Sequence, residues 1–158
     1  MSCVSLAFRQ ASIADIAAIN ALFWELDTDA INSQPQHFQR GGRAREYLSD
    51  LVSDENSDFL LAVFDGEIVG FSLLFSKETK DLSLLVPCKY AYIQDFVVKS
   101  THRNRGVGSR LMDASKSWAK AHGAEYLRLS VLPDNENAQR FYSRHGLTRQ
   151  MISMECPI

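Results

Sequence analysis

The sequence lacks the features that mark membrane, secreted and metal-binding proteins. Its longest apolar runs, such as residues 59–64, are far too short to cross a bilayer, and the N-terminus has no basic-then-apolar signal pattern. We therefore expect a cytoplasmic protein with no membrane partner. The three cysteines, Cys3, Cys88 and Cys156, are scattered, and the four histidines do not cluster with them or with carboxylates. This spacing predicts reduced thiols and no metal site.

An excess of charge of one sign is also missing, since 17 Lys and Arg residues stand against 19 Asp and Glu residues, a formal net charge of −2. A balance this close to neutral predicts no general affinity for nucleic acid. It conceals an asymmetry, because residues 1–98 have 7 basic and 14 acidic side chains, whereas residues 99–158 have 10 and 5. We interpret the two parts as candidates for two binding surfaces of opposite charge.

The composition is that of one folded domain over residues 1–158, with 46% hydrophobic residues and nine Phe to fill a core. Alternating and helical apolar spacings predict the order β-α-α-β-β-β-α-β-α-β, a mixed α/β domain with helices packed on a central sheet. We expect residues 27–42 to be irregular. The predicted strands are 4–9, 59–64, 67–75, 90–98, 125–132 and a final strand or pair of strands over 147–155, and the predicted helices are 13–26, 43–51, 109–122 and 135–145.

The stretch from Lys99 to Arg110 is the most informative part of the chain. It has four basic residues and no acidic one, and Gly106 and Gly108 stand at the start of a predicted helix. The first turn of a helix has backbone N–H groups without partners and the positive end of the helix dipole, and glycine lets a phosphate approach them. The pattern therefore favours a pyrophosphate site, with a tight turn bearing solvated arginines as the alternative. Leu111 stands where a dinucleotide fingerprint needs a third glycine, and no Lys-Ser/Thr pair of a P-loop is present.

These residues resemble a known family. The segment Arg103–Gly108 resembles the Arg/Gln-x-x-Gly-x-Gly/Ala motif of the GCN5-related N-acetyltransferases, the GNAT family. In order along the chain, residues 93–98 resemble the family's fourth strand, residues 127–132 its fifth strand, and residues 135–142 its Asn-x-x-Ala-x-x-Phe-Tyr segment. The resemblance covers nearly the whole chain. It implies a mixed, mostly antiparallel central sheet flanked by helices, with acetyl-CoA as the cosubstrate.

The resemblance also implies which residues contact the cofactor. The backbone of Phe96 and Val98, freed by a β-bulge, would bind the pantetheine arm. Asn137 would contact the CoA arm, although Asn also suits the start of a helix. The pyrophosphate would be bound by the loop Arg103, Asn104, Arg105, Gly106, Val107, Gly108 and Ser109, in which Arg105 either assists or points into water.

Tyr142 matches the family's general acid. A thiol has a pKa near 8.5 and a phenol one near 10, so a tyrosine can protonate the departing sulfur. The alternative is a half-buried aromatic residue. The base is less clear, because Gln94 stands where many relatives have Glu. We name Asp95 as the candidate base, which reaches the site only if a bulge reorients it, with water and backbone carbonyls as the alternative.

The expected activity is transfer of an acetyl group to a primary amine of a small molecule, by direct attack of the amine on the thioester. Acetylation of a protein or peptide is a second hypothesis, and a CoA-binding regulatory module without turnover is a third, which Gln94 leaves open. Glu25, Asp27 and Asp29 on the acceptor side would favour a cationic amine, unless they are only a solvated helix end. Relatives are often dimers, so a homodimer is a further expectation.

Overall fold

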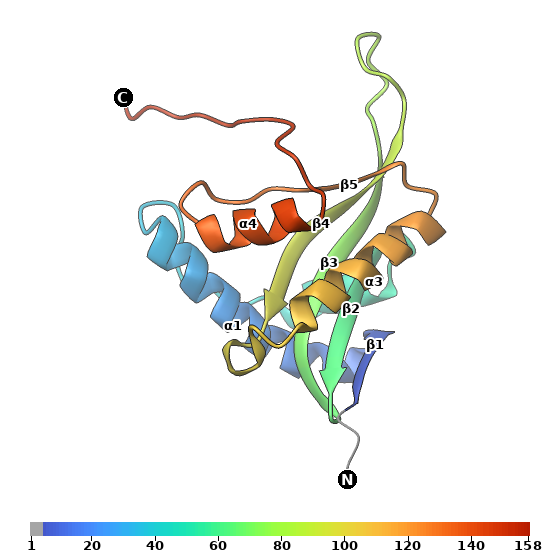
Figure 1. The fold of residues 1–158 in the computed structure, drawn as a ribbon, viewed down its shortest axis with the longest axis vertical. Helices are drawn as coiled ribbons and strands as arrows, with labels where there is room; N and C mark the ends of the chain where they lie inside the picture. The colour runs from blue at the N-terminus through green and yellow to red at the C-terminus, as the bar shows by residue number, and fades with distance from the viewer. Residues whose placement is uncertain (1–4) are drawn as a thin grey trace.

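Five strands form one open sheet whose order in space follows their order in the chain (Figure 1). The computed structural model describes residues 5–158. Cys3 therefore lies outside the described residues, and so does Val4, the first residue of the expected strand 4–9. Neighbouring strands are antiparallel except β4 and β5, which are parallel. This arrangement confirms the expected mixed, mostly antiparallel sheet. The strands are β1 (Leu6–Gln10), β2 (Ser57–Phe64), β3 (Glu67–Glu78), β4 (Lys89–Val98) and β5 (Tyr126–Leu129).

Helices cover both faces of the sheet. One buried cluster joins α1 (Ile16–Ser33) and α2 (Arg45–Ser53) to one face, and a second joins α3 (Val107–Ala121) and α4 (Glu136–Arg144) to the other. Short 3₁₀ turns, η1 (Ile13–Asp15) and η2 (Ser100–His102), precede α1 and α3. Because β3 is central, its side chains are buried on both faces, and alternate residues serve the two clusters. α3 connects the parallel strands β4 and β5, as parallel pairing requires.

The β2–β3 hairpin turns at Asp65 and Gly66, whose positive φ angles of 48° and 84° are those that a two-residue hairpin turn requires. Further along β3, Gly70 lies against β4 so closely that a Cβ atom there would be 2.6 Å from the carbonyl oxygen of Val97. A contact that short is a clash with backbone. Gly70 is therefore what allows β3 to approach the C-terminal half of β4.

The entry to α1 is fixed by an ion pair. The guanidinium of Arg9 donates to both carboxylate oxygens of Asp15 at 2.8 and 2.9 Å, and the backbone N–H of Ser12 donates to the same carboxylate at 2.8 Å. Arg9 and these hydrogen bonds hold the pKa of Asp15 well below its usual range. The pair joins β1 to the start of the helix.

Two predictions about the elements are wrong. α1 continues to Ser33, seven residues beyond the expected end at Leu26, because nothing breaks the helix before Pro35. The final strand or pair of strands over 147–155 is not formed, and residues 148–158 make no backbone–backbone hydrogen bond with any described residue. The segment passes over α4 instead of along β5 (Figure 1), so it has no strand to pair with.

Candidate active site

A β-bulge lies in the middle of β4. Leu73 of β3 is paired with Asp95 and the next residue, Leu74, with Ile93, so Gln94 has no partner in the register. One extra residue shifts the alternation of side chains by one position. Asp95 therefore faces α1, although by simple alternation it would share the α3 face with Ile93. The bulge fulfils the condition on which the sequence made Asp95 a candidate base.

The C-terminal half of β4 is open on one side. β5 pairs with β4 only across Tyr90–Ile93, and no described strand lies beside the C-terminal half of β4 on that side. The backbone N–H of Lys99 donates to the carbonyl of Val69 on β3 at 2.7 Å. Since strand backbone groups alternate in direction, those of Phe96 and Val98 point away from β3 and into the opening. These are the two residues that the sequence assigns to the pantetheine arm.

The first turn of α3 opens beside this gap. Gly106 has a φ of 79°, a left-handed conformation that favours glycine, and α3 begins at the next residue. Arg110 makes the first helical bond, its N–H donating to the carbonyl of Gly106 at 3.2 Å. The preceding amides, those of Val107, Gly108 and Ser109, have no backbone acceptor among the described residues. The loop thus presents three N–H groups at the positive end of a helix.

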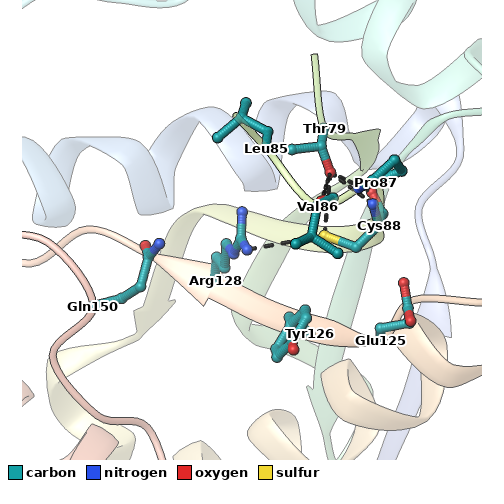
Figure 2. Close-up of a pocket in the computed structure, with 9 residues that line it drawn as sticks. All are labelled: Thr79, Leu85, Val86, Pro87, Cys88, Glu125, Tyr126, Arg128 and Gln150. Carbon is teal, nitrogen blue, oxygen red and sulfur yellow. Dashed lines mark hydrogen bonds between the residues drawn. The ribbon is translucent and has the colours of Figure 1, made fainter. Parts of the chain in front are cut away.

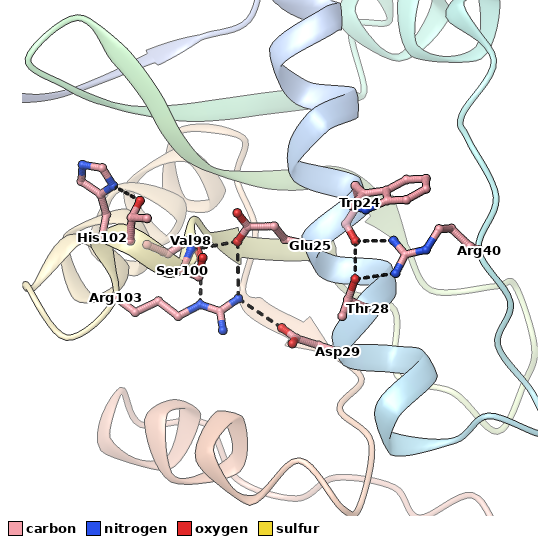
Figure 3. Close-up of polar contacts among 10 residues, drawn as sticks. Trp24, Glu25, Thr28, Asp29, Arg40, Val98, Ser100, His102 and Arg103 are labelled. Atoms are coloured by element: carbon pink, nitrogen blue, oxygen red, sulfur yellow. Dashed lines mark hydrogen bonds and ion pairs between the residues drawn. The ribbon is translucent and has the colours of Figure 1, made fainter.

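The side chain of Arg103 turns toward α1 (Figure 3). Its Nε donates to the carbonyl of Val98 at 2.9 Å, and its Nη2 lies 3.2 Å from the carboxylate of Asp29 and 3.9 Å from that of Glu25. The same Glu25 carboxylate accepts a hydrogen bond from the backbone N–H of Ser100 at 2.8 Å. Arg103 thus joins the loop to α1. Its own backbone N–H donates to the carbonyl of Ser100 at 3.4 Å, so it is not one of the three free amides.

Three other predicted contacts lie at the edge of this loop or on α4. The guanidinium of Arg105 lies over the ring of Phe64, 4.9 Å from its centroid. Asn104 has a φ of 58° and forms the turn that precedes Gly106. On α4, the Asn137 side chain accepts a hydrogen bond from Arg140 at 2.5 Å and is exposed.

Tyr142 reaches β4 from α4. Its ring contacts Phe96 with the centroids 6.3 Å apart, and the adjacent Phe141 ring is 5.7 Å from that of Phe96. Asn135 caps the helix by accepting from the N–H of Ala138 at 3.2 Å. Burial raises the pKa of Tyr142 to about 12, so its hydroxyl is protonated at neutral pH. The structure therefore brings Tyr142 to the part of β4 that pairs with β3 but not with β5.

Asp95 lies on the other face of β4 in a charged cluster. Burial raises its pKa to about 6, the charge of Arg43 opposes that rise, and the charge of Asp27 adds to it. Arg43 donates to Asp27 at 2.6 Å and stacks over the ring of Phe23 at 4.3 Å. No motif in the sequence indicated Arg43, because it stands in a loop more than 50 residues before Asp95. A pKa near neutrality is what a general base needs.

The acidic residues expected to receive a cationic acceptor are engaged within the protein. Asp27 is paired with Arg43, and Asp29 and Glu25 are held by Arg103 and the amide of Ser100. They are not a free carboxylate cluster, and they lie within α1 and not at its end, although the Asp29 side chain is 49% exposed. Their contacts fix α1 against the loop and β4.

A pocket of about 280 Å³ lies at the other end of β4, before the strand begins (Figure 2). It contains none of the predicted site residues. Its lining is Thr79, Leu85, Val86, Pro87, Cys88, Glu125, Tyr126, Arg128 and Gln150. Within residues 5–158, no group of three or more His, Cys, Asp or Glu residues is arranged to hold a metal ion. No helix in the same range is both long and apolar enough to span a membrane.

Comparison with known proteins agrees with this geometry. The sequence model of the acetyltransferase (GNAT) family matches residues 18–147. An uncharacterized N-acetyltransferase of Bacillus subtilis, YhfO, is 31% identical over 143 residues, which cover 87% of each chain. The streptothricin acetyltransferase of Escherichia coli is 33% identical over 104 residues, 66% of this chain and 55% of that one. The crystal structure of a tetramutant of the BH1408 protein from Bacillus halodurans superposes with a TM-score of 0.91 at 27% identity, covering 96% of this chain and 99% of the other.

The chain belongs to the GNAT family of acetyltransferases and is an acyltransferase. The family generally uses acetyl-CoA as the acyl donor. The sequence motif, the opening between β4 and β5 and the family match thus all support acetyl transfer.

Proposed function

We propose that this protein transfers an acetyl group from acetyl-CoA to a primary amine of a small molecule, with Asp95 as the general base and Tyr142 as the general acid. The observation that carries the proposal is the bulged strand β4. Its opening beside β5 leaves backbone groups free, and its bulge turns Asp95 toward α1 while Tyr142 contacts Phe96.

The residues present fit an acetyl-CoA molecule. The amides of Val107, Gly108 and Ser109 would hold the pyrophosphate at the N-terminus of α3. The backbone of Phe96 and Val98 would hold the pantetheine arm in the gap that β5 leaves. The carbonyl of Val98 already accepts from Arg103, so the groups left for the arm are its N–H and the backbone of Phe96.

Acetyl-CoA supplies a thioester whose carbonyl carbon accepts the amine. Before that attack the alkylammonium must lose a proton, which Asp95 accepts, directly or through a water molecule. As the new C–N bond forms and the C–S bond breaks, Tyr142 donates its phenolic proton to the departing sulfur. The nitrogen then gives up its second proton as the amide forms, directly or through water, to the phenolate of Tyr142, which restores the phenol. The buried hydroxyl of Tyr142 holds its proton at any pH near neutrality, because the pKa is raised to about 12.

A small-molecule acceptor is supported by the E. coli relative, which is a streptothricin acetyltransferase and shares 33% identity over 104 residues. The regulatory-module hypothesis depended on the absence of a base at Gln94. The bulge weakens it, because Asp95 takes the α1-facing position beside Gln94.

The test is release of free CoA thiol when the protein is given acetyl-CoA with a panel of small primary amines, and separately with lysine-containing peptides. We expect release with members of the amine panel, a mass gain of one acetyl group on the amine, and loss of both with Tyr142→Phe. Release with peptides alone would instead favour the protein or peptide acetyltransferase hypothesis.

A further inference from the structure

Six aromatic and basic residues of β3, β4 and β5 lie together on the face of the sheet that α1 and α2 partly cover, and we call them the platform. The register places them in two rows, Phe75, Tyr92 and Arg128 in the first and Lys77, Tyr90 and Tyr126 in the second. Phe75 packs against the buried cluster of α1 and α2. Because paired residues, and alternate residues of one strand, have their side chains on the same face, all six share that face.

Each of the two cations of the platform lies over two of its rings. The Nζ of Lys77 is 4.8 Å from the ring centroid of Tyr92 and 5.5 Å from that of Phe75. The guanidinium of Arg128 is 4.4 Å and 5.4 Å from the centroids of the two remaining tyrosines. Both positive charges are thus held above the sheet by aromatic faces.

These two charges are not neutralised. Neither Lys77 nor Arg128 forms an ion pair with a described carboxylate, and the Nη2 of Arg128 lies 4.0 Å from the Sγ of Cys88. By contrast, Arg43 and Arg103 on the same side of the molecule are paired with acidic residues of α1. An aromatic ring fixes a cation without cancelling its charge, so the platform remains available to an anion.

The platform begins next to Asp95. Asp95 is opposite Leu73 in the register, and the next pair on the same face is Phe75 with Tyr92. A strand rises about 3.3 Å per residue, so Phe75 lies roughly 7 Å and Lys77 roughly 13 Å along β3 from Leu73. A ligand with its amine at Asp95 would therefore meet the platform cations with a group about 7–13 Å away.

The β5 side of the platform adjoins the pocket of about 280 Å³, which Tyr126 and Arg128 help to line (Figure 2). Glu125 is the acidic residue in that lining, and its carboxylate accepts a hydrogen bond from the backbone N–H of Lys89 at 3.3 Å. The hollow gives an anionic group space beside the guanidinium of Arg128.

We propose that the acceptor amine carries an anionic group, a carboxylate or a phosphate, which Lys77 and Arg128 bind while the amine reaches Asp95. This inference rests on the proposed function and specifies its substrate class. Amines with several positive charges are disfavoured, because the acidic residues of α1 are already paired and the platform adds two positive charges.

Acceptors of matched length test the proposal, with release of CoA thiol as the readout. The panel consists of ω-amino carboxylates, ω-aminoalkyl phosphates, amino alcohols and diamines of graded length. The unchanged protein should favour an anionic series over the amino alcohols by at least tenfold in kcat/KM, and the series it favours identifies the group. Lys77→Glu and Arg128→Glu should each lower this ratio at least tenfold and raise kcat/KM for diamines relative to amino carboxylates. Lys120→Glu, on the exposed surface of α3, is the control and should keep the ratio.

Calorimetry separates failure of this inference from failure of the proposed function. If no amine is acetylated, the proposed function fails, but one of the anionic amines should still bind the unchanged protein at least tenfold more tightly than Lys77→Glu. Lys77 is exposed, so this variant should fold. Equal kcat/KM for anionic and neutral acceptors, a preference for diamines, an anion preference that survives both charge reversals, or equal binding of the anionic amines by Lys77→Glu would each overturn the proposal.

Discussion

Burial raises the pKa of two titratable side chains beside the middle of β4, with opposite consequences. Tyr142, with a pKa of about 12, keeps its proton, whereas Asp95, with a pKa of about 6, is mostly ionised above neutrality and still accepts a proton readily. One group is a proton donor and the other an acceptor at the same pH. Acid–base catalysis typically uses such a pair of titratable groups, whose different environments separate their pKa values.

Tyr142→Phe removes the proposed proton donor and keeps the aromatic contact with Phe96. We expect kcat to fall by about 10²–10⁴-fold, the usual worth of a positioned acid, with acetyl-CoA affinity unchanged. Tyr47→Phe, on exposed α2 surface, serves as the matched control. Steady-state rates with an identified amine and calorimetric binding of acetyl-CoA separate the two effects. Equal kcat for Tyr142→Phe and the unchanged protein would remove Tyr142 from the mechanism.

Asp95→Asn should affect rate and stability in opposite directions. In the unchanged enzyme kcat/KM should rise with pH through about 6 as Asp95 loses its proton, and Asp95→Asn should lose that limb and at least about 10²-fold in rate. A raised folded-state pKa means that the folded protein retains this proton between pH 3.8 and about 6 while the unfolded chain does not. Stability from this group therefore falls as pH rises through that window.

Above pH 6 the ionised Asp95 lowers the free energy of unfolding by a constant amount. Asp95→Asn removes this buried charge and should therefore raise the free energy of unfolding by up to about 3 kcal/mol at pH 8. Urea titrations at pH 4 and pH 8 check this, with no gain expected at pH 4. A variant that is less stable at pH 8, or that keeps the rising limb, would show that Asp95 is a structural anion.

At the scale of elements, the site depends on how β4 is held by its neighbours. β3 approaches it through Gly70, the bulge turns Asp95, and Arg103 and Glu25 join the following loop to α1. Each contact acts on the same strand and the loop that leaves it. A change in any of them should move the cofactor groups and the proposed base together.

Gly70→Ala tests this dependence, because its Cβ would stand 2.6 Å from the carbonyl oxygen of Val97. We expect a loss of about 1–3 kcal/mol in the free energy of unfolding, and weaker acetyl-CoA binding as β4 is displaced. Gly42→Ala, where nothing lies within 4 Å of the new Cβ, should change neither. Thermal unfolding and calorimetry report the two quantities. Normal stability of Gly70→Ala would mean that β3 and β4 separate without cost.

Sequence patterns predicted the elements that local chemistry determines. The glycine turn before α3, marked by Gly106, depends on a few adjacent residues. The end of α1 was misplaced because nothing breaks the helix before Pro35. Distant residues also contact the turns beyond Leu26, with Arg43 paired to Asp27 and Arg103 to Asp29. The effect of Arg43 on the pKa of Asp95 was also missed, because no local sequence pattern indicates a contact between segments far apart in the chain.

For the whole molecule, the two oppositely charged parts of the sequence turn out to meet. Arg103 of the basic part is paired with Asp29 and Glu25 of the acidic part, so some of the asymmetry is neutralised inside the fold. The charges that remain for a ligand are fewer than the sequence count suggests. In the proposed function, attraction of the pyrophosphate would therefore depend mainly on the amides at the start of α3.

The most direct test of the central claim is calorimetric titration of the protein with acetyl-CoA, compared with Gly108→Asp. A Cβ at residue 108 would meet the Phe141 ring at 3.5 Å, an ordinary contact, so the variant should fold while placing a negative charge among the amides that would hold the pyrophosphate. Ser117→Asp, on the exposed surface of the same helix, is the control. We predict one acetyl-CoA per chain at micromolar affinity for the unchanged protein and Ser117→Asp, and at least a hundredfold loss for Gly108→Asp. Absence of binding at several hundred micromolar acetyl-CoA, or equal binding by Gly108→Asp, would contradict the account.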